Sequence, residues 1–154
     1  MLAEQVIARF VERGSTLALA ESCTGGLVSH RLTNVPGSSD VLIVGIVVYS
    51  NKAKTRLARV EPATLERTGP YSHEVARELA VGVRRILSST VGLGITGLAG
   101  PSGGTPALPV GTVFMSVSTI DQTTSHQFHF SGDREEIKLA ASTQALELLE
   151  KEVI

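Results

Sequence analysis

Hydroxyl, thiol and amine side chains gather in three Gly- and Ser-rich regions, each of which follows an apolar run. These regions are "ESCTGG" at 21–26, "PGSSD" at 36–40 with "YSNKAK" at 49–54, and "TGLAGPSGG" at 96–104. In α/β domains, chemistry gathers where strands end in loops and helices begin. The three regions are therefore candidate parts of one site.

The segment "ESCTGG" follows a predicted strand and precedes a predicted helix. Gly25 and Gly26 would let backbone N–H groups face a ligand, and the helix dipole would favour an anion there. The same pattern equally fits an N-cap with a glycine turn. It is neither a Walker loop nor a Rossmann fingerprint.

A lysine just past a buried strand is open to partial desolvation, which lowers its pKa and lets the neutral amine act as a base toward a serine. Lys52 and Lys54 both occupy such positions, and the alternative is that both are solvated at a helix start. Arg134, one residue into a predicted helix, would hold an anion or lie exposed. The lone Cys23 is expected to pack as a small hydrophobe.

Composition narrows the classes of partner. A net charge of −1 without a basic stripe argues against nucleic acid and anionic lipid as partners. The four histidines show no zinc-type spacing, so no metal is expected. No cofactor is expected either. One cysteine and no signal or membrane-spanning pattern favour a cytoplasmic protein.

The chain of 154 residues suits one domain, 1–154. Parallel helix–strand units at the front and a later hairpin predict an α/β fold with a mixed sheet between helix layers. The run 41–49 is apolar and β-branched, which favours a strand buried on both sides. Strands are also expected at 16–20, 91–96, 110–119 and 124–130, and helices near 2–13, 27–34, 62–67, 72–87 and from 133 onward.

Four stretches occur in the order and spacing of the CinA C-terminal domain family, the nicotinamide-nucleotide amidases, which the chain resembles over nearly its whole length. They are "AESCTGGLVSHRLTNVPGSSD", "YSNKAK", "ITGLAGPSGGT" followed by "PVGTV", and "FSGDREEI". The resemblance implies a three-layer α/β/α sandwich with a mixed central sheet. It also implies hydrolysis of nicotinamide mononucleotide to nicotinate mononucleotide and ammonia, in pyridine nucleotide salvage. The alternative is a non-catalytic nucleotide-binding or regulatory module.

The resemblance further implies a serine–lysine mechanism without metal. Lys54 would be the general base and Tyr49 would orient it or the substrate. Ser39 is the expected nucleophile, with Ser22 as the alternative. Substrate-binding roles fall to a larger set: Thr24, Gly25, Gly26, Thr96, Gly97, Gly100 and Arg134.

The chain departs from the family pattern before its long helix. Pro70 and Tyr71 stand where the family commonly has Ala-Val, which would reshape a neighbouring pocket. Apolar residues left over on the helices also lead us to expect a homodimer.

Overall fold

The computed structural model describes residues 1–153, in which five strands form one mixed sheet in the order β2-β1-β3-β4-β5. Strand β1 runs parallel to both β2 and β3. Strand β4 runs antiparallel to β3 and β5, and β4–β5 is the predicted hairpin. The strands are β1 (Leu17–Glu21), β2 (Leu42–Val47), β3 (Val91–Gly97), β4 (Thr112–Ser118) and β5 (Thr123–His129).

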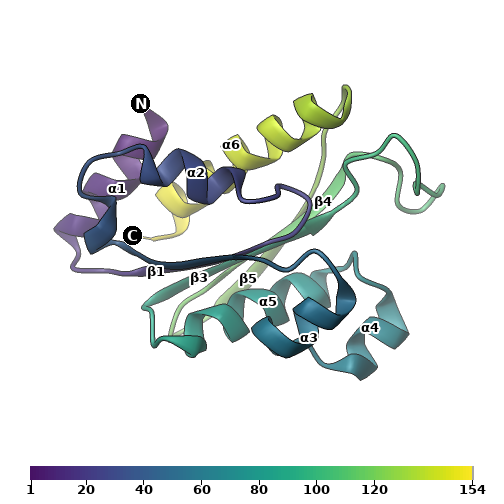
Figure 1. Ribbon diagram of the computed structural model, residues 1–154, viewed down its shortest axis with the longest axis horizontal. Helices are drawn as coiled ribbons and strands as arrows, with labels where there is room; N and C mark the ends of the chain where they lie inside the picture. The colour runs from purple at the N-terminus through teal and green to yellow at the C-terminus, as the bar shows by residue number, and fades with distance from the viewer. Residues whose placement is uncertain (154) are drawn as a thin grey trace.

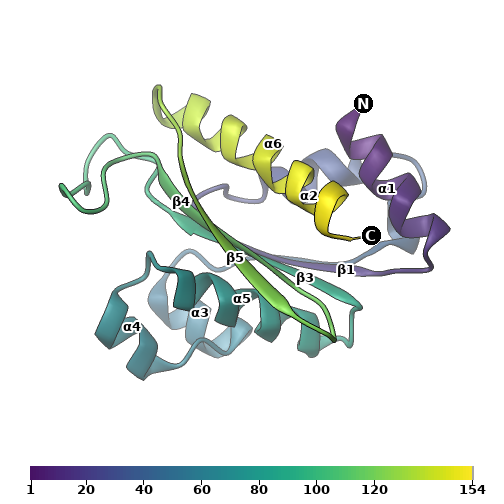
Figure 2. The same cartoon turned by 180° about the vertical axis from the view of Figure 1, so that it is seen from behind.

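Helices cover both faces of this sheet (Figures 1 and 2). One face carries α1 (Leu2–Glu12), α2 (Leu27–Thr33) and α6 (Arg134–Glu152). The other carries α3 (Asn51–Ala58), α4 (Pro62–Thr68) and α5 (His73–Ile86). A short 3-10 helix, Ser38–Asp40, leads into β2. The expected three-layer α/β/α sandwich with a mixed sheet is confirmed.

The alternation of side chains along β1 separates two cores. Leu17 and Leu19 join the larger apolar cluster on the α1–α2–α6 side, whereas Ala18 and Ala20 join the smaller cluster against α5. Glycine in β3 brings α5 close on that side, since a Cβ at Gly94 would lie 2.5 Å from the carbonyl oxygen of Ala76. Because α3 and α4 pack against α5, the close packing of α5 on the sheet determines where these two helices lie.

Three of the helix starts are capped by the side chain of the N-cap residue. Ser72 and Asp133, at starts that the sequence predicts, accept hydrogen bonds from the N–H groups of Val75 and Glu136. Ser50 caps α3 in the same way through Ala53. Each cap satisfies a backbone donor that the helix leaves free.

Strand β2 corrects one expectation, because it is an edge strand and not a strand buried on both sides. Ile43 and Val47 remain 42% and 47% exposed. An apolar, β-branched run is typical of both central and edge strands, so composition alone could not distinguish them. The homodimer stays a prediction.

Across residues 1–153, every helix is either too short or too polar to span a lipid bilayer.

Candidate active site

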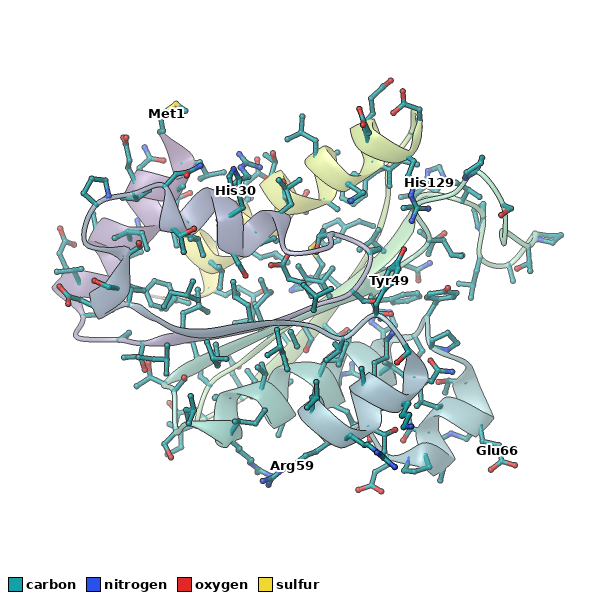
Figure 3. The ribbon with its side chains drawn as sticks, in the orientation of Figure 1. Met1, His30, Tyr49, Arg59, Glu66 and His129 are labelled. Carbon is teal, nitrogen blue, oxygen red and sulfur yellow. The ribbon has the colours of Figure 1, made fainter. Side chains whose placement is uncertain are left out.

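A cavity of about 280 Å³ opens at the carboxyl ends of the parallel strands. Ser22 follows β1, Lys54 lies in the helix after β2, and Gly97 ends β3. Figure 3 places Tyr49 at this end of the sheet, between the two helix layers. The cavity is lined by Ser22, Cys23, Tyr49, Asn51, Lys54, Pro70, Tyr71, Gly97, Leu98, Ala99, Gly100, Ser102 and Arg134.

Lys54 reaches this cavity from the inner side of α3 and is only 2% exposed. Its Nζ lies 3.2 Å from Ser22 Oγ, 3.1 Å from the carbonyl oxygen of Val48 and 3.4 Å from that of Tyr49. Burial disfavours the ammonium and lowers the pKa of Lys54 below 10.5. Burial therefore shifts the equilibrium of the amine toward its neutral form.

The two carbonyl oxygens orient the neutral amine. An NH₂ group has two hydrogens to donate. The carbonyl oxygens of Val48 and Tyr49 can only accept hydrogen bonds, so they take both of these hydrogens. The lone pair is then left for the third neighbour, Ser22 Oγ. In this state Ser22 donates its hydroxyl hydrogen to Lys54, which is the arrangement that activates a serine nucleophile.

Ser39 does not reach this site. It is exposed in the 3-10 helix that precedes β2, whereas Lys54 lies beyond the other end of that strand. Six residues of strand at ~3.3 Å each separate the two ends by roughly 20 Å. The structure thus corrects the expected pairing of Ser39 with Lys54, and the alternative, Ser22, is the serine within reach of the amine.

The glycine turn after Ser22 leads into a helix N-terminus that already holds a carboxylate of the chain itself. The carboxylate of Glu21 already occupies the N-terminus of α2, where it accepts the N–H groups of Val28 and Ser29. Thr24 donates its hydroxyl to the same carboxylate. Gly25 and Gly26 have φ of 61° and 95° and shape the turn. Thr24 and both glycines lie outside the cavity lining, and their substrate-binding role stays a prediction.

The opposite wall is the segment that follows β3. Gly97 and Gly100 line the cavity as expected. Thr96 does not, because its buried hydroxyl donates to the carbonyl oxygen of Pro70 at 2.7 Å. Thr96 therefore holds the neighbouring Pro70–Tyr71 wall in place.

Arg134 closes one side of the cavity from the first turn of α6. Its guanidinium donates to the hydroxyl of Tyr49 at 2.7 Å and to the carbonyl oxygen of Gly100. The Tyr49 side chain thus contacts Arg134, and it is the Tyr49 carbonyl that contacts Lys54. The expected roles of both residues are compatible with this placement.

Sequence reasoning assigned no role to Asn51 and Ser102, which line the cavity and lie in the quoted segments "YSNKAK" and "TGLAGPSGG". Tyr71 was visible only as a departure from the family pattern; it lines the cavity, as does Tyr49, the only other tyrosine in the chain. Cys23 also lines it, and burial raises the pKa of its thiol to about 12. Such a thiol stays protonated at neutral pH and is a poor nucleophile.

Metal-ligating side chains do not cluster in the described part of the chain: no three His, Cys, Asp or Glu residues there are placed to hold an ion.

Known proteins resemble this chain in both sequence and fold. The chain is 47% identical over 152 residues to a CinA-like protein of Acidobacterium capsulatum and, again over 152 residues, to one of Koribacter versatilis. It spans 37% of the length of each of these relatives.

Among solved structures, a CinA superfamily protein from Enterobacter cloacae superposes with a TM-score of 0.94 at 33% identity, covering 99% of this chain and 90% of the other. A competence/damage-inducible protein from Agrobacterium tumefaciens gives a TM-score of 0.91 at 36% identity, covering 96% and 91%. The family model described as the CinA C-terminal domain matches residues 1–153. The chain belongs to the CinA C-terminal domain family.

Proposed function

We propose that this chain is an amidohydrolase that converts nicotinamide mononucleotide to nicotinate mononucleotide and ammonia without a metal, with Ser22 as nucleophile and Lys54 as base. The observation that carries the proposal is the 3.2 Å approach of a buried lysine amine to a serine hydroxyl inside a cavity. A site that only bound a nucleotide would not need such a pair.

The chemistry follows from the two groups. Lys54 takes the proton of Ser22 while Oγ attacks the carboxamide carbon, and the carbonyl oxygen becomes an oxyanion. The ammonium of Lys54 then gives its proton to the departing nitrogen, which leaves as ammonia, and an ester on Ser22 remains. Water attacks this ester with Lys54 again as base, which releases the carboxylic acid and restores Ser22.

Two features of the walls support this substrate. The N–H groups of Ala99 and Gly100 enter no hydrogen bond among residues 1–153, so both remain free to donate to an oxyanion in the cavity. Arg134 lines the same cavity and brings a positive charge for a phosphate.

The test is ammonia release from nicotinamide mononucleotide by the purified chain, with and without chelator. We expect turnover in both, and loss of turnover in Ser22→Ala and Lys54→Met but not in Lys52→Met, which alters an exposed lysine on the same helix. Saturable binding of the nucleotide without ammonia release at any pH would instead identify a non-catalytic module. Restoration of chelator-treated protein by zinc would contradict the metal-free mechanism.

We also propose that the protein acts in the cytoplasm, where a free thiol stays reduced.

A further inference from the structure

Glu21 is the last residue of β1 and directly precedes Ser22, yet its carboxylate lies outside the cavity lining and is 1% exposed with the rest of the residue. One oxygen accepts from the Thr24 hydroxyl at 2.7 Å and from the Val28 N–H at 3.0 Å. The other accepts from the N–H and the hydroxyl of Ser29, at 3.0 and 2.7 Å. All four donors come from the turn and helix that follow Ser22.

A buried carboxylate is costly unless its charge is compensated. Within residues 1–153 no lysine or arginine forms an ion pair with Glu21. Compensation comes instead from the four donors and from the N-terminal dipole of α2. The Glu21 carboxylate is therefore bound to the N-terminus of α2, and this attachment closes the turn between Ser22 and Gly26.

The backbone of Glu21 reaches the other half of the pair. Its carbonyl oxygen accepts the N–H of Val48 at 2.8 Å. The carbonyl of Val48 in turn accepts from Lys54 Nζ. One residue thus connects the turn that carries Ser22 to the strand end that orients Lys54.

We propose that Glu21 is a positioning residue, whose carboxylate holds the Ser22 turn against α2 so that Oγ stays within reach of Lys54 Nζ. The proposal rests on the proposed function only in taking Ser22 as the nucleophile, and it is independent of which amide is cleaved.

Glu21→Gln tests the carboxylate at nearly constant size. A carboxamide has one oxygen, whereas Glu21 receives a backbone N–H of α2 on each of its two oxygens. In either orientation of the amide, its NH₂ group faces one of these N–H groups, so the turn must shift. Thr24→Val removes a third donor at similar shape, and Thr24→Ser keeps that hydroxyl and should restore the wild-type behaviour.

The readout is covalent labelling of Ser22 by phenylmethylsulfonyl fluoride, followed by intact-mass analysis across pH. In this reaction Oγ bonds to sulfur, fluoride leaves, and the serine proton passes to Lys54. We expect the plateau rate to fall about 100-fold in Glu21→Gln, while the pH midpoint of labelling stays where it is in the wild type. Turnover of Glu21→Gln should fall because kcat falls, with KM unchanged. Thr24→Val should have a plateau labelling rate and a kcat between those of the wild type and Glu21→Gln.

Ser142→Ala is the matched control, because Ser142 is a buried residue of α6 that accepts from Arg31 on the α2 side, away from the cavity. It should lower the melting temperature without slowing labelling. A folded Glu21→Gln protein that labels at the wild-type plateau overturns the proposal. A shifted midpoint at an unchanged plateau also overturns it, because Glu21 would then act on the charge of Lys54.

The crystal structure of Glu21→Gln tests the positioning role of Glu21 even if phenylmethylsulfonyl fluoride does not label the wild type. A distance between Ser22 Oγ and Lys54 Nζ equal to the wild-type value contradicts a positioning role. Failure of the proposed function looks different: Ser22 would label normally and depend on Glu21, but nicotinamide mononucleotide would yield no ammonia.

Discussion

Ser22 and Ser39 were the two candidates for the nucleophile, and single substitutions distinguish between them. Ser22→Ala removes the hydroxyl that lies 3.2 Å from Lys54 Nζ, so we expect turnover to fall to the background rate. Ser39→Ala alters an exposed side chain at the far end of β2, and its kcat/KM should stay within about twofold of the wild type. Ammonia release measures both. Loss of activity in Ser39→Ala alone would require Ser39 to be the nucleophile after all.

Cys23 offers a second test at the scale of single residues. Its thiol lines the cavity, but burial raises the pKa to about 12, so the reactive thiolate is scarce at neutral pH. We expect Cys23→Ala to retain kcat within a few-fold. Iodoacetamide should modify the folded wild-type protein far more slowly than the same protein in denaturant. Rapid alkylation of the folded chain that also abolishes turnover would contradict this assignment.

The residues that could be predicted are those whose chemistry is visible along the chain. The position after a strand indicates that Lys52 or Lys54 is a desolvated base, and only the family resemblance selects Lys54. A helix start indicates that Arg134 either binds an anion or lies exposed, and the same resemblance assigns it to the site. The predicted pairing of Ser39 with Lys54 was wrong because two residues lie close only when they follow the same ends of neighbouring parallel strands. The segment "PGSSD" precedes β2, whereas "ESCTGG" follows β1. The role of Glu21 was missed because an acidic residue beside a serine gives no sign of being buried.

Among the elements, the contact between α3 and α5 governs where Lys54 lies. A Cβ added at Gly82 would come within 1.7 Å of the carbonyl oxygen of Ala58, the last residue of α3. Gly82→Ala must therefore push α3 away from α5. We expect a loss of about 1–3 kcal/mol in the free energy of unfolding, and a lower kcat because α3 carries the base.

Urea denaturation and ammonia release measure these two effects. Arg85→Ala is the control, since it alters an exposed residue of the same helix and should change the free energy of unfolding by no more than about 0.5 kcal/mol. An unchanged midpoint of urea denaturation in Gly82→Ala would mean that α3 can move away from α5 with little loss of free energy of unfolding.

Most element types followed from local patterns, although the helix α3 was expected only as the alternative setting of Lys52 and Lys54. The environments of the elements did not follow from local patterns. The capping residues Ser72 and Asp133 begin helices where expected, and the β4–β5 hairpin turns at the expected place. These features depend on neighbours in sequence. The exposure of β2 depends on which strand pairs beside it, and that information is spread over the whole chain.

At the scale of the molecule, the site lies where the chain leaves adjacent strands in opposite directions. From β1 it enters α2 on one face of the sheet, and from the neighbouring β2 it enters α3 on the other face (Figure 1). Diverging connections open a crevice at the carboxyl ends of such strands. An α/β pattern predicts that such a crevice exists, but the assignment of helices to faces, which brings Ser22 and Lys54 together, required the structure.

The burial of Lys54 also makes the stability of the whole molecule depend on pH. Because its pKa is lowered below 10.5 in the folded chain, the unfolded chain binds more protons between the folded value and 10.5. The free energy of unfolding of the wild type should therefore rise relative to Lys54→Met as the pH increases through the folded pKa. The rise is at most about 1.4 kcal/mol per pH unit.

Cys23 would obscure this rise, because its pKa is raised by folding from 9.0 to about 12 and contributes the opposite slope above pH 9. Urea denaturation from pH 6 to pH 10 is therefore best compared between Cys23→Ala and the double variant Cys23→Ala, Lys54→Met. Diverging curves, with the lysine-containing protein gaining stability toward high pH, are the expected result. Parallel curves would mean that the amine holds its proton as tightly in the folded chain as in the unfolded one, and a lysine in that state could not take the proton of Ser22 at neutral pH.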